Sequence, residues 1–229
     1  MIYTDFVKNC EEFLSNLSEN NDKEWFNAHR EEYNEKLLYP AQDFVLDMGS
    51  RLADIYPDIQ AIPAVDKSIF RLYKDVRFSK DKKPFKTNLG ILFWEGNKKR
   101  IECPGFYFHI EPGQFLLGSG IYMFTKELLE QFRSVVSNPA KAAQLDAIVK
   151  KIQKKNGMRI GEKSYKKIPK GFDPDYKYAE YYLYSALYSI YESNDTKKLY
   201  NADIVEHSLK VYRDFFPLHE WFTENMTNN

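Results

Sequence analysis

The segment 106–122 restricts the possible folds more than any other part of the 229-residue chain. Apolar residues occupy every second position of residues 106–111, which is the period of a strand with one buried side. Pro112-Gly113 then favours a tight turn, and a second apolar-rich run follows at 115–122. These features predict an antiparallel β-hairpin, and therefore a sheet, in the middle of the chain.

Two further segments of the middle third are predicted to be strands. Residues 69–73 alternate in polarity, which places Arg71 and Tyr73 on the same side of a strand. Residues 89–94 form a nearly continuous apolar run, which is typical of a buried strand. We therefore expect an antiparallel or mixed sheet, and the order of its strands stays open.

Helical periodicity dominates both ends of the chain. Apolar side chains recur at helical spacing in six segments, at 6–17, 22–37, 40–55, 125–136, 139–152 and 201–222. The sequence thus predicts an α+β fold in which N-terminal and C-terminal helices flank the sheet. We expect a single domain over 1–229, with a helical part (1–66), a strand-rich core (67–123) and a mostly helical part (124–229).

The composition argues against several protein classes. Hydrophobic residues make up 43% of the chain, enough for a core, yet no apolar run reaches the roughly 20 residues that span a bilayer. No signal peptide is recognisable, and with Cys10 and Cys103 as the only cysteines we expect neither a disulfide framework nor a cysteine-based zinc cluster. A cytoplasmic protein with no membrane partner fits best. The common nucleotide-binding, nucleophile-elbow and zinc-protease motifs are absent, so no cofactor and no metal is implied.

The zero net charge conceals two basic blocks. Residues 67–101 and 126–170 each carry a net charge of +8, whereas 1–66 carries −9 and 171–229 carries −5. Such segregation indicates either an anion-binding surface or charge pairing within the chain.

The first basic block contains RLYKDVRFSKDKKPFKT, residues 71–87, in which aromatic side chains lie between the charges. Guanidinium and ammonium groups bind phosphate and carboxylate, so a ligand site is predicted here. Lysines that protect an exposed strand edge are the alternative, and it suits residues 80–83 better. For Arg71 and Arg77, a ligand and a carboxylate partner within the protein are equally open. The predicted ligand-binding residues are Arg71, Tyr73, Arg77, Lys86, Thr87 and Tyr107.

Tyr107, His109 and Glu111 are predicted to share one side of the first hairpin strand, because they are spaced two residues apart. An imidazole near a carboxylate can act as a general base or acid near neutral pH, which makes His109 and Glu111 the catalytic candidates. The alternative is a purely structural hydrogen bond from His109 to one of its two neighbours. If the Arg71 segment lies beside this hairpin, we expect Arg71, Tyr73, His109 and Glu111 to line one cleft.

Nucleic-acid binding is a second hypothesis. The basic segments 71–86 and 150–170 would contact phosphates, while Tyr73, Phe78 and Tyr107 would stack on bases. The neutral overall charge makes this interpretation weaker. A protein-interaction module, whose charges pair across an interface, is a third hypothesis.

Five segments span nearly the full length of the chain: NNDKEWFNAHREEY (20–33), IFRLYKDVRFSKDKKPFKTNLG (69–90), GFYFHIEPGQFLLGSGIY (105–122), IPKGFDP (168–174) and FFPLHEWF (215–222). In this order they resemble the domain of unknown function 2461 family of conserved hypothetical proteins. The resemblance implies that family positions are occupied by Arg71, Arg77, Phe78, Asp81, Lys86, Thr87, His109 and Glu111. Asn88 departs from the family, in which histidine is common at that place. The resemblance implies no activity, cofactor or substrate.

The leading hypothesis from the sequence is a cytosolic small-molecule enzyme or ligand-binding protein. Its ligand would carry a phosphate or carboxylate and would bind in a cationic cleft lined by aromatic side chains. Whether the protein is an enzyme stays open at this point.

Overall fold

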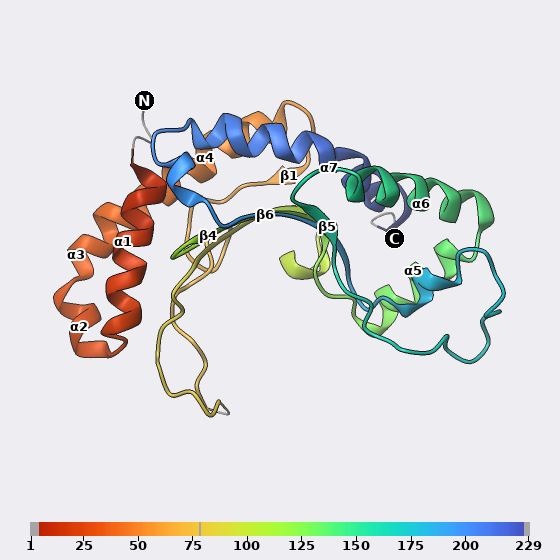
Figure 1. The fold of residues 1–229 in the computed structure, drawn as a ribbon, viewed down its shortest axis with the longest axis horizontal. Coiled ribbons are helices and arrows are strands. Elements are labelled where there is room, and N and C mark those ends of the chain that lie inside the picture. The colour runs from red at the N-terminus through yellow and green to blue at the C-terminus, as the bar shows by residue number, and fades with distance from the viewer. Residues whose placement is uncertain (1–4, 78, 227–229) are drawn as a thin grey trace. The chain divides into compact units, whose positions relative to one another are not determined.

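The computed structural model describes residues 5–77 and 79–226 (Figure 1). It has an α+β fold with a six-stranded antiparallel sheet, which confirms the fold class expected from the sequence and resolves the strand pairing as antiparallel. The strand order is β1-β2-β3-β4-β6-β5. The strands are β1 Ile59–Gln60, β2 Leu89–Glu95, β3 Gly105–Glu111, β4 Gln114–Ile121, β5 Met158–Ile160 and β6 Leu187–Ser193.

Helices make up most of the remaining chain, and several begin at the capping residues that the sequence offers. The side chains of Asp22, Thr125 and Asn138 accept backbone N–H groups at the starts of α2, α5 and α6. Among the described residues, no helix combines the length and apolar character needed to cross a membrane. The α-helices are α1 Phe6–Glu19, α2 Lys23–Ala28, α3 Arg30–Tyr33, α4 Tyr39–Ala53, α5 Lys126–Val136, α6 Pro139–Gln153 and α7 Ile204–Met226. The π-helix η1 is Asn34–Leu38, and the 3₁₀ turns are η2 Arg100–Glu102, η3 Ala179–Leu183 and η4 Thr196–Leu199.

The chain divides into two compact units, each assembled from separate stretches of sequence. One contains Met1–Phe93, Tyr107–Leu117 and Glu192–Lys210. The other contains Trp94–Phe106, Gly118–Tyr191 and Val211–Asn229. We call them unit 1 and unit 2, and the single domain expected from the sequence stays a prediction.

In unit 1 the core lies between α1, α4 and one side of β3. The ring of Phe108 lies 4.4 Å from that of Phe44 on α4 and 6.3 Å from that of Phe6 on α1. Phe108 and Ile110 are fully buried, while Tyr107, His109 and Glu111 between them are only partly covered. Alternation along β3 therefore places its three polar side chains opposite the face that packs on α4.

In unit 2 the aromatic residues of α7 form the core with Phe106. The Phe106 ring lies 5.1 Å from that of Tyr212 and 4.6 Å from that of His219. His219 has no exposed surface, and its Nε2 lies 3.0 Å from Oε2 of Glu95. α7 continues through Pro217 to Met226.

The prediction of a continuous strand over residues 69–73 was wrong. Only isolated bridges occur there, from Ile69 to Val65 and Ile91 and from Tyr73 to Phe85, within the long excursion between β1 and β2 (Figure 1). The physical reason is a change of partner: the Phe70 N–H binds the Gly90 carbonyl, whereas the Leu72 carbonyl accepts from Lys86. The segment thus leaves β2 after two residues and folds back on itself as a loop.

The basic stretch after α6 contains a short strand that was not predicted from the sequence. Met158–Ile160 forms the short strand β5, paired antiparallel with β6 through Met158–Tyr191 and Ile160–Ser189. Three residues are too few for the period of two to be recognised in a sequence.

Candidate functional site

The three polar side chains of β3 form a connected line in unit 1. The Tyr107 hydroxyl lies 3.0 Å from Nδ1 of His109, and Nε2 of His109 lies 3.6 Å from Oε2 of Glu111. The side chain of His109 is 16% exposed and that of Glu111 is 38% exposed. The imidazole is therefore largely covered, but the carboxylate at the end of the line reaches solvent.

These distances favour one arrangement of protons. With the ring proton on Nε2, directed at the Glu111 carboxylate, Nδ1 of His109 accepts the hydroxyl proton of Tyr107. Burial lowers the pKa of His109 from 6.5, although the charge of Glu111 and its hydrogen bond to the imidazole act in the opposite direction. His109 is consequently a neutral imidazole near pH 7, which is the form that accepts a proton.

Gly90 on the neighbouring strand β2 makes the position of Tyr107 possible. A β-carbon on Gly90 would lie 2.7 Å from the Tyr107 hydroxyl oxygen and 3.3 Å from a ring carbon of Phe70. The Phe70 ring meets the Tyr107 ring edge to face, with centroids 6.1 Å apart. Tyr107 therefore packs against the backbone of Gly90, which has no side chain, and against the ring of Phe70.

Lys86 is a predicted ligand-binding cation that contacts Phe70, which in turn contacts Tyr107. Its Nζ lies 5.7 Å from the centroid of the Phe70 ring, at a distance typical of a cation–π contact. Lys86 and the adjacent Thr87 are both partly buried. Lys86 thus contacts Phe70, Phe70 contacts Tyr107, and Tyr107 contacts His109.

Arg71 and Arg77 lie next to carboxylates of their own segment. Nε of Arg71 is 3.9 Å from Asp66, and the Arg71 side chain is 56% exposed. Arg77 binds Asp75 through Nε at 2.9 Å and Nη2 at 2.6 Å, with a side chain 77% exposed. This contact lowers the pKa of the Asp75 carboxyl group and raises that of Arg77. Both guanidinium groups are accessible to solvent and already hold an acidic neighbour.

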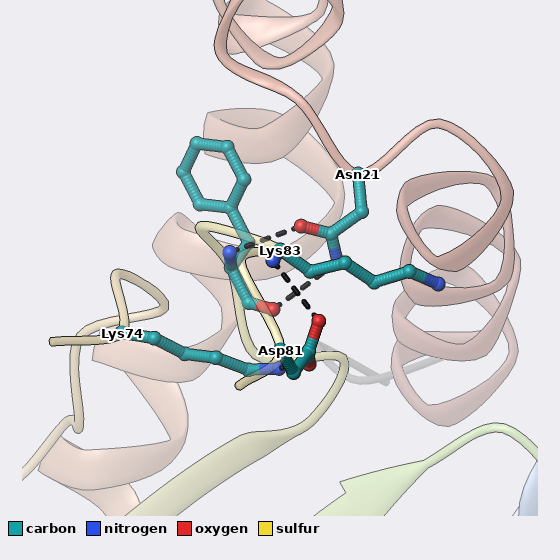
Figure 2. Close-up of polar contacts among 5 residues, drawn as sticks. Asn21, Lys74, Asp81 and Lys83 are labelled. Carbon is teal, nitrogen blue, oxygen red and sulfur yellow. Dashed lines mark hydrogen bonds and ion pairs between the residues drawn. The ribbon is translucent and has the colours of Figure 1, made fainter. Parts of the chain in front are cut away.

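The loop that carries these residues is fastened at its base by Asn21, as Figure 2 shows. The Asn21 amide accepts the Phe85 N–H at 3.0 Å and donates to the Phe85 carbonyl at 3.1 Å. The same view shows Lys74 meeting Asp81, a 3.2 Å contact, while Asp81 also accepts the Lys83 N–H at 3.0 Å. These contacts lower the pKa of Asp81. The loop is therefore held at both its base and its interior by polar contacts.

An aromatic cluster supports the same base and includes the predicted ligand-binding residue Tyr73. The Tyr73 ring lies 4.6 Å from that of Phe85, and the Phe85 ring stacks on Phe26 of α2 at 4.3 Å. The rings of Trp25 and His29 stack with centroids 4.0 Å apart. Phe78 lies outside the residues that the structure describes.

Part of the basic charge in both blocks is paired locally. In the second block, Lys150 lies 2.7 Å from Asp146, Lys155 lies 3.1 Å from Asp214, and Lys163 lies 2.9 Å from Glu180. The lysine of each pair is exposed to solvent, so each pair contributes little to stability. Each pair nevertheless reduces the charge available to a polyanion.

Several contacts around this region join residues far apart in sequence and were not predicted. Asn21 meets a residue 64 positions away, and Glu11 of α1 binds the Gly113 N–H, 102 positions away. Both Asn21 and Gly113 lie inside the segments that resemble a known family, which is the one available signal. Across residues 5–77 and 79–226, no group of three or more His, Cys, Asp or Glu side chains is arranged to hold a metal ion.

A comparison with protein families gives one result. The family model described as Conserved hypothetical protein (DUF2461) matches residues 9–221, nearly the whole chain. Neither the curated proteins nor the solved structures include a significant match.

Proposed function

The chain belongs to the family described as Conserved hypothetical protein (DUF2461), and from the geometry of its residues we propose that it is a proton-transferring enzyme for a small anionic molecule. The reaction would take place on the open side of β3, at Tyr107, His109 and Glu111. The observation that carries the proposal is the 3.0 Å contact between the Tyr107 hydroxyl and Nδ1 of a largely buried, neutral His109. Burial alone lowers the pKa of a histidine, so the feature that supports a role beyond structure is the partly exposed Glu111 carboxylate that faces Nε2.

Each of the three residues has a distinct role in this proposal. A proton leaving the substrate passes to the Tyr107 oxygen while the phenolic proton moves to Nδ1 of His109. The resulting imidazolium is stabilised by Glu111, whose carboxylate faces Nε2. Tyr107 is neutral before and after the step, and the positive charge on His109 balances the charge left on the substrate.

Lys86 is the proposed anchor for the phosphate or carboxylate of the substrate. It is the partly buried cation connected through Phe70 to Tyr107. Arg71 and Arg77 are proposed as secondary anion ligands at the rim, because their guanidinium groups are exposed to solvent. Thr87 and Tyr73 are the neighbouring polar groups in this arrangement.

The experiment is a titration of ¹⁵N-labelled protein with inorganic phosphate and with acetate, followed by NMR. We expect the signals of Lys86, Tyr107 and His109 to shift together, and Lys86→Gln to weaken binding at least about tenfold. Lys83→Gln removes the same charge from the exposed part of the loop and serves as the control. Equal weakening by both substitutions, or shifts confined to the loop lysines, would contradict the proposal.

Binding to nucleic acid is the second candidate, and the exposed lysines of segments 71–86 and 150–170 are what favours it. The local pairing of Lys74, Lys150, Lys155 and Lys163 argues for a weak contact. Its diagnostic property is affinity for single- or double-stranded oligonucleotides that falls steeply with salt concentration. Absence of such binding at low salt would remove this candidate.

A cytoplasmic location is part of the proposal. Cys10 and Cys103 are free, buried thiols, and burial raises the pKa of both. Such thiols stay protonated and unreactive, as suits a reducing compartment. Cell fractionation would test this, and recovery in a secreted or membrane fraction would contradict it.

A further inference from the structure

Unit 1 contains a cavity that is separate from the residues given a role above. It is a shallow, broadly open pocket of about 460 Å³. Its walls come from α1, from the π-helix η1, from the Pro112-Gly113 turn and from the segment that includes η4. A volume of this size accommodates a small metabolite.

The most unusual group in the cavity wall is the carboxylate of Glu11. Glu11 is 6% exposed, accepts the Gly113 N–H at 2.8 Å and accepts the Tyr200 hydroxyl at 2.6 Å. Both donors are neutral. Within the described part of the chain, the cations Lys8 and Lys36 pair with the exposed neighbour Glu12 and not with Glu11.

A buried carboxylate without a cation is costly, because hydrogen bonds from neutral donors compensate only part of the lost hydration. Glu11 nevertheless lines the pocket, and 6% of its surface stays exposed to solvent. Its four lone-pair positions hold only two donors, which leaves acceptors for an ammonium group. The cavity therefore suits a ligand with a primary amine.

Two lysines on other walls indicate the rest of the ligand. Lys197 of η4 is exposed and borders the cavity, as does Lys36 of η1, whose Nζ is 2.9 Å from Glu32. Lys36 is thus committed to an acidic partner, whereas Lys197 is the cation available for an anion. A π-helix such as η1 is rare and occurs frequently at functional sites.

We propose that this cavity binds a small zwitterion of the amino-acid type, with its ammonium group on Glu11 and its carboxylate on Lys197. The site does not depend on the proposed proton transfer at His109. The two proposed sites also differ in the charge that they bind, because Glu11 binds a cation whereas Lys86 binds an anion.

The experiment uses the full chain and a series of unbranched ω-amino acids from glycine to 5-aminovalerate, measured by calorimetry or NMR at millimolar concentration. Changing the length varies the separation of amine and carboxylate, so we expect affinity to peak at one member. n-Butylamine, which lacks the carboxylate, is expected to bind at least about tenfold more weakly than the best member. No binding by any member, or equal binding of n-butylamine, would overturn the proposal.

Glu11→Gln is the matched variant, because a glutamine amide can still accept from Gly113 and can donate to the Tyr200 oxygen. We expect the fold to persist and the affinity for the best ω-amino acid to fall at least about tenfold. Glu19→Gln, at the exposed end of α1, is the control and should leave affinity unchanged. Should Glu11→Gln fail to fold, Lys197→Ala provides the test. Loss of selectivity for the amino acid over n-butylamine supports the site, and unchanged selectivity contradicts it.

Discussion

Gly90 and Tyr107 share a space on adjacent strands that only one of them can fill: a β-carbon on Gly90 would lie 2.7 Å from the Tyr107 hydroxyl oxygen. The hydroxyl is the far end of a side chain, so it can be displaced at a moderate cost. Displacement would break its 3.0 Å contact with His109. The glycine therefore controls where the proposed proton-transfer group lies.

The first prediction concerns this pair. Gly90→Ala and Tyr107→Phe should each destabilise the protein, but the double variant should lose less than the sum, because Phe removes the atom that clashes. The expected coupling is about 0.5–3 kcal/mol, from urea unfolding of all four proteins. If the double variant lost as much free energy of unfolding as the two single variants together, the two residues would not compete for space.

The second prediction tests the fastening of the basic loop. Asn21→Ala removes one acceptor and one donor from the Phe85 backbone and should lower the free energy of unfolding by about 1–3 kcal/mol. Asn21→Asp keeps the acceptor for the Phe85 N–H but sets a carboxylate oxygen against the Phe85 carbonyl oxygen, so it should also destabilise the protein. Asn20→Ala is the adjacent control, since the Asn20 side chain makes an exposed bond to Asn16. If Asn20→Ala lowered the free energy of unfolding as much as Asn21→Ala, the stabilising role of the Asn21 contacts with Phe85 would be refuted.

The third prediction concerns acid stability. The pKa of His109 is lowered in the folded state, so below about pH 6.5 the unfolded state binds more protons and stability falls as the pH decreases. His109→Gln should flatten this dependence between about pH 5 and pH 7. Burial also lowers the pKa of His207, so His207→Gln should flatten it further. A slope that is unchanged in His109→Gln would contradict the lowered pKa.

The fourth prediction concerns alkaline stability. The hydrogen bond to Glu11 raises the pKa of Tyr200 from 10.0 to about 12. Unfolded tyrosine loses its proton first, so the stability that Tyr200 contributes is complete below about pH 10 and is lost towards pH 12. Tyr200→Phe should be less stable at neutral pH, by about 1–3 kcal/mol, and less sensitive to pH above 10. The exposed Tyr39→Phe is the control, and a wild-type-like alkaline response in Tyr200→Phe would contradict the account.

The α+β class, and the placement of Tyr107, His109 and Glu111 on one side of β3, could be predicted from the sequence because both depend on local periodicity. A period of two is sufficient to place Tyr107, His109 and Glu111 on one side of a strand. Asn21 and Glu11 could not be found in this way, since their partners lie 64 and 102 residues away and only tertiary packing brings them together.

The ion pair between Arg77 and Asp75, in contrast, could have been predicted from the sequence. Asp75 and Arg77 are two residues apart in an exposed loop, and their side chains meet without help from the rest of the fold. The strand predicted at 69–73 does not form, although the local sequence pattern favoured it. Its alternation was regular, but its backbone changes hydrogen-bonding partner between Phe70 and Leu72.

The central claim is that His109 is a neutral proton acceptor with its own proton on Nε2. Long-range ¹H–¹⁵N correlation spectra of the histidine rings, recorded from about pH 5 to pH 8, measure both the tautomer and the pKa, and His109→Gln assigns the signal. The account predicts the Nε2–H tautomer at neutral pH and a pKa below 6.5. A pKa above 6.5, or a proton on Nδ1, would contradict it.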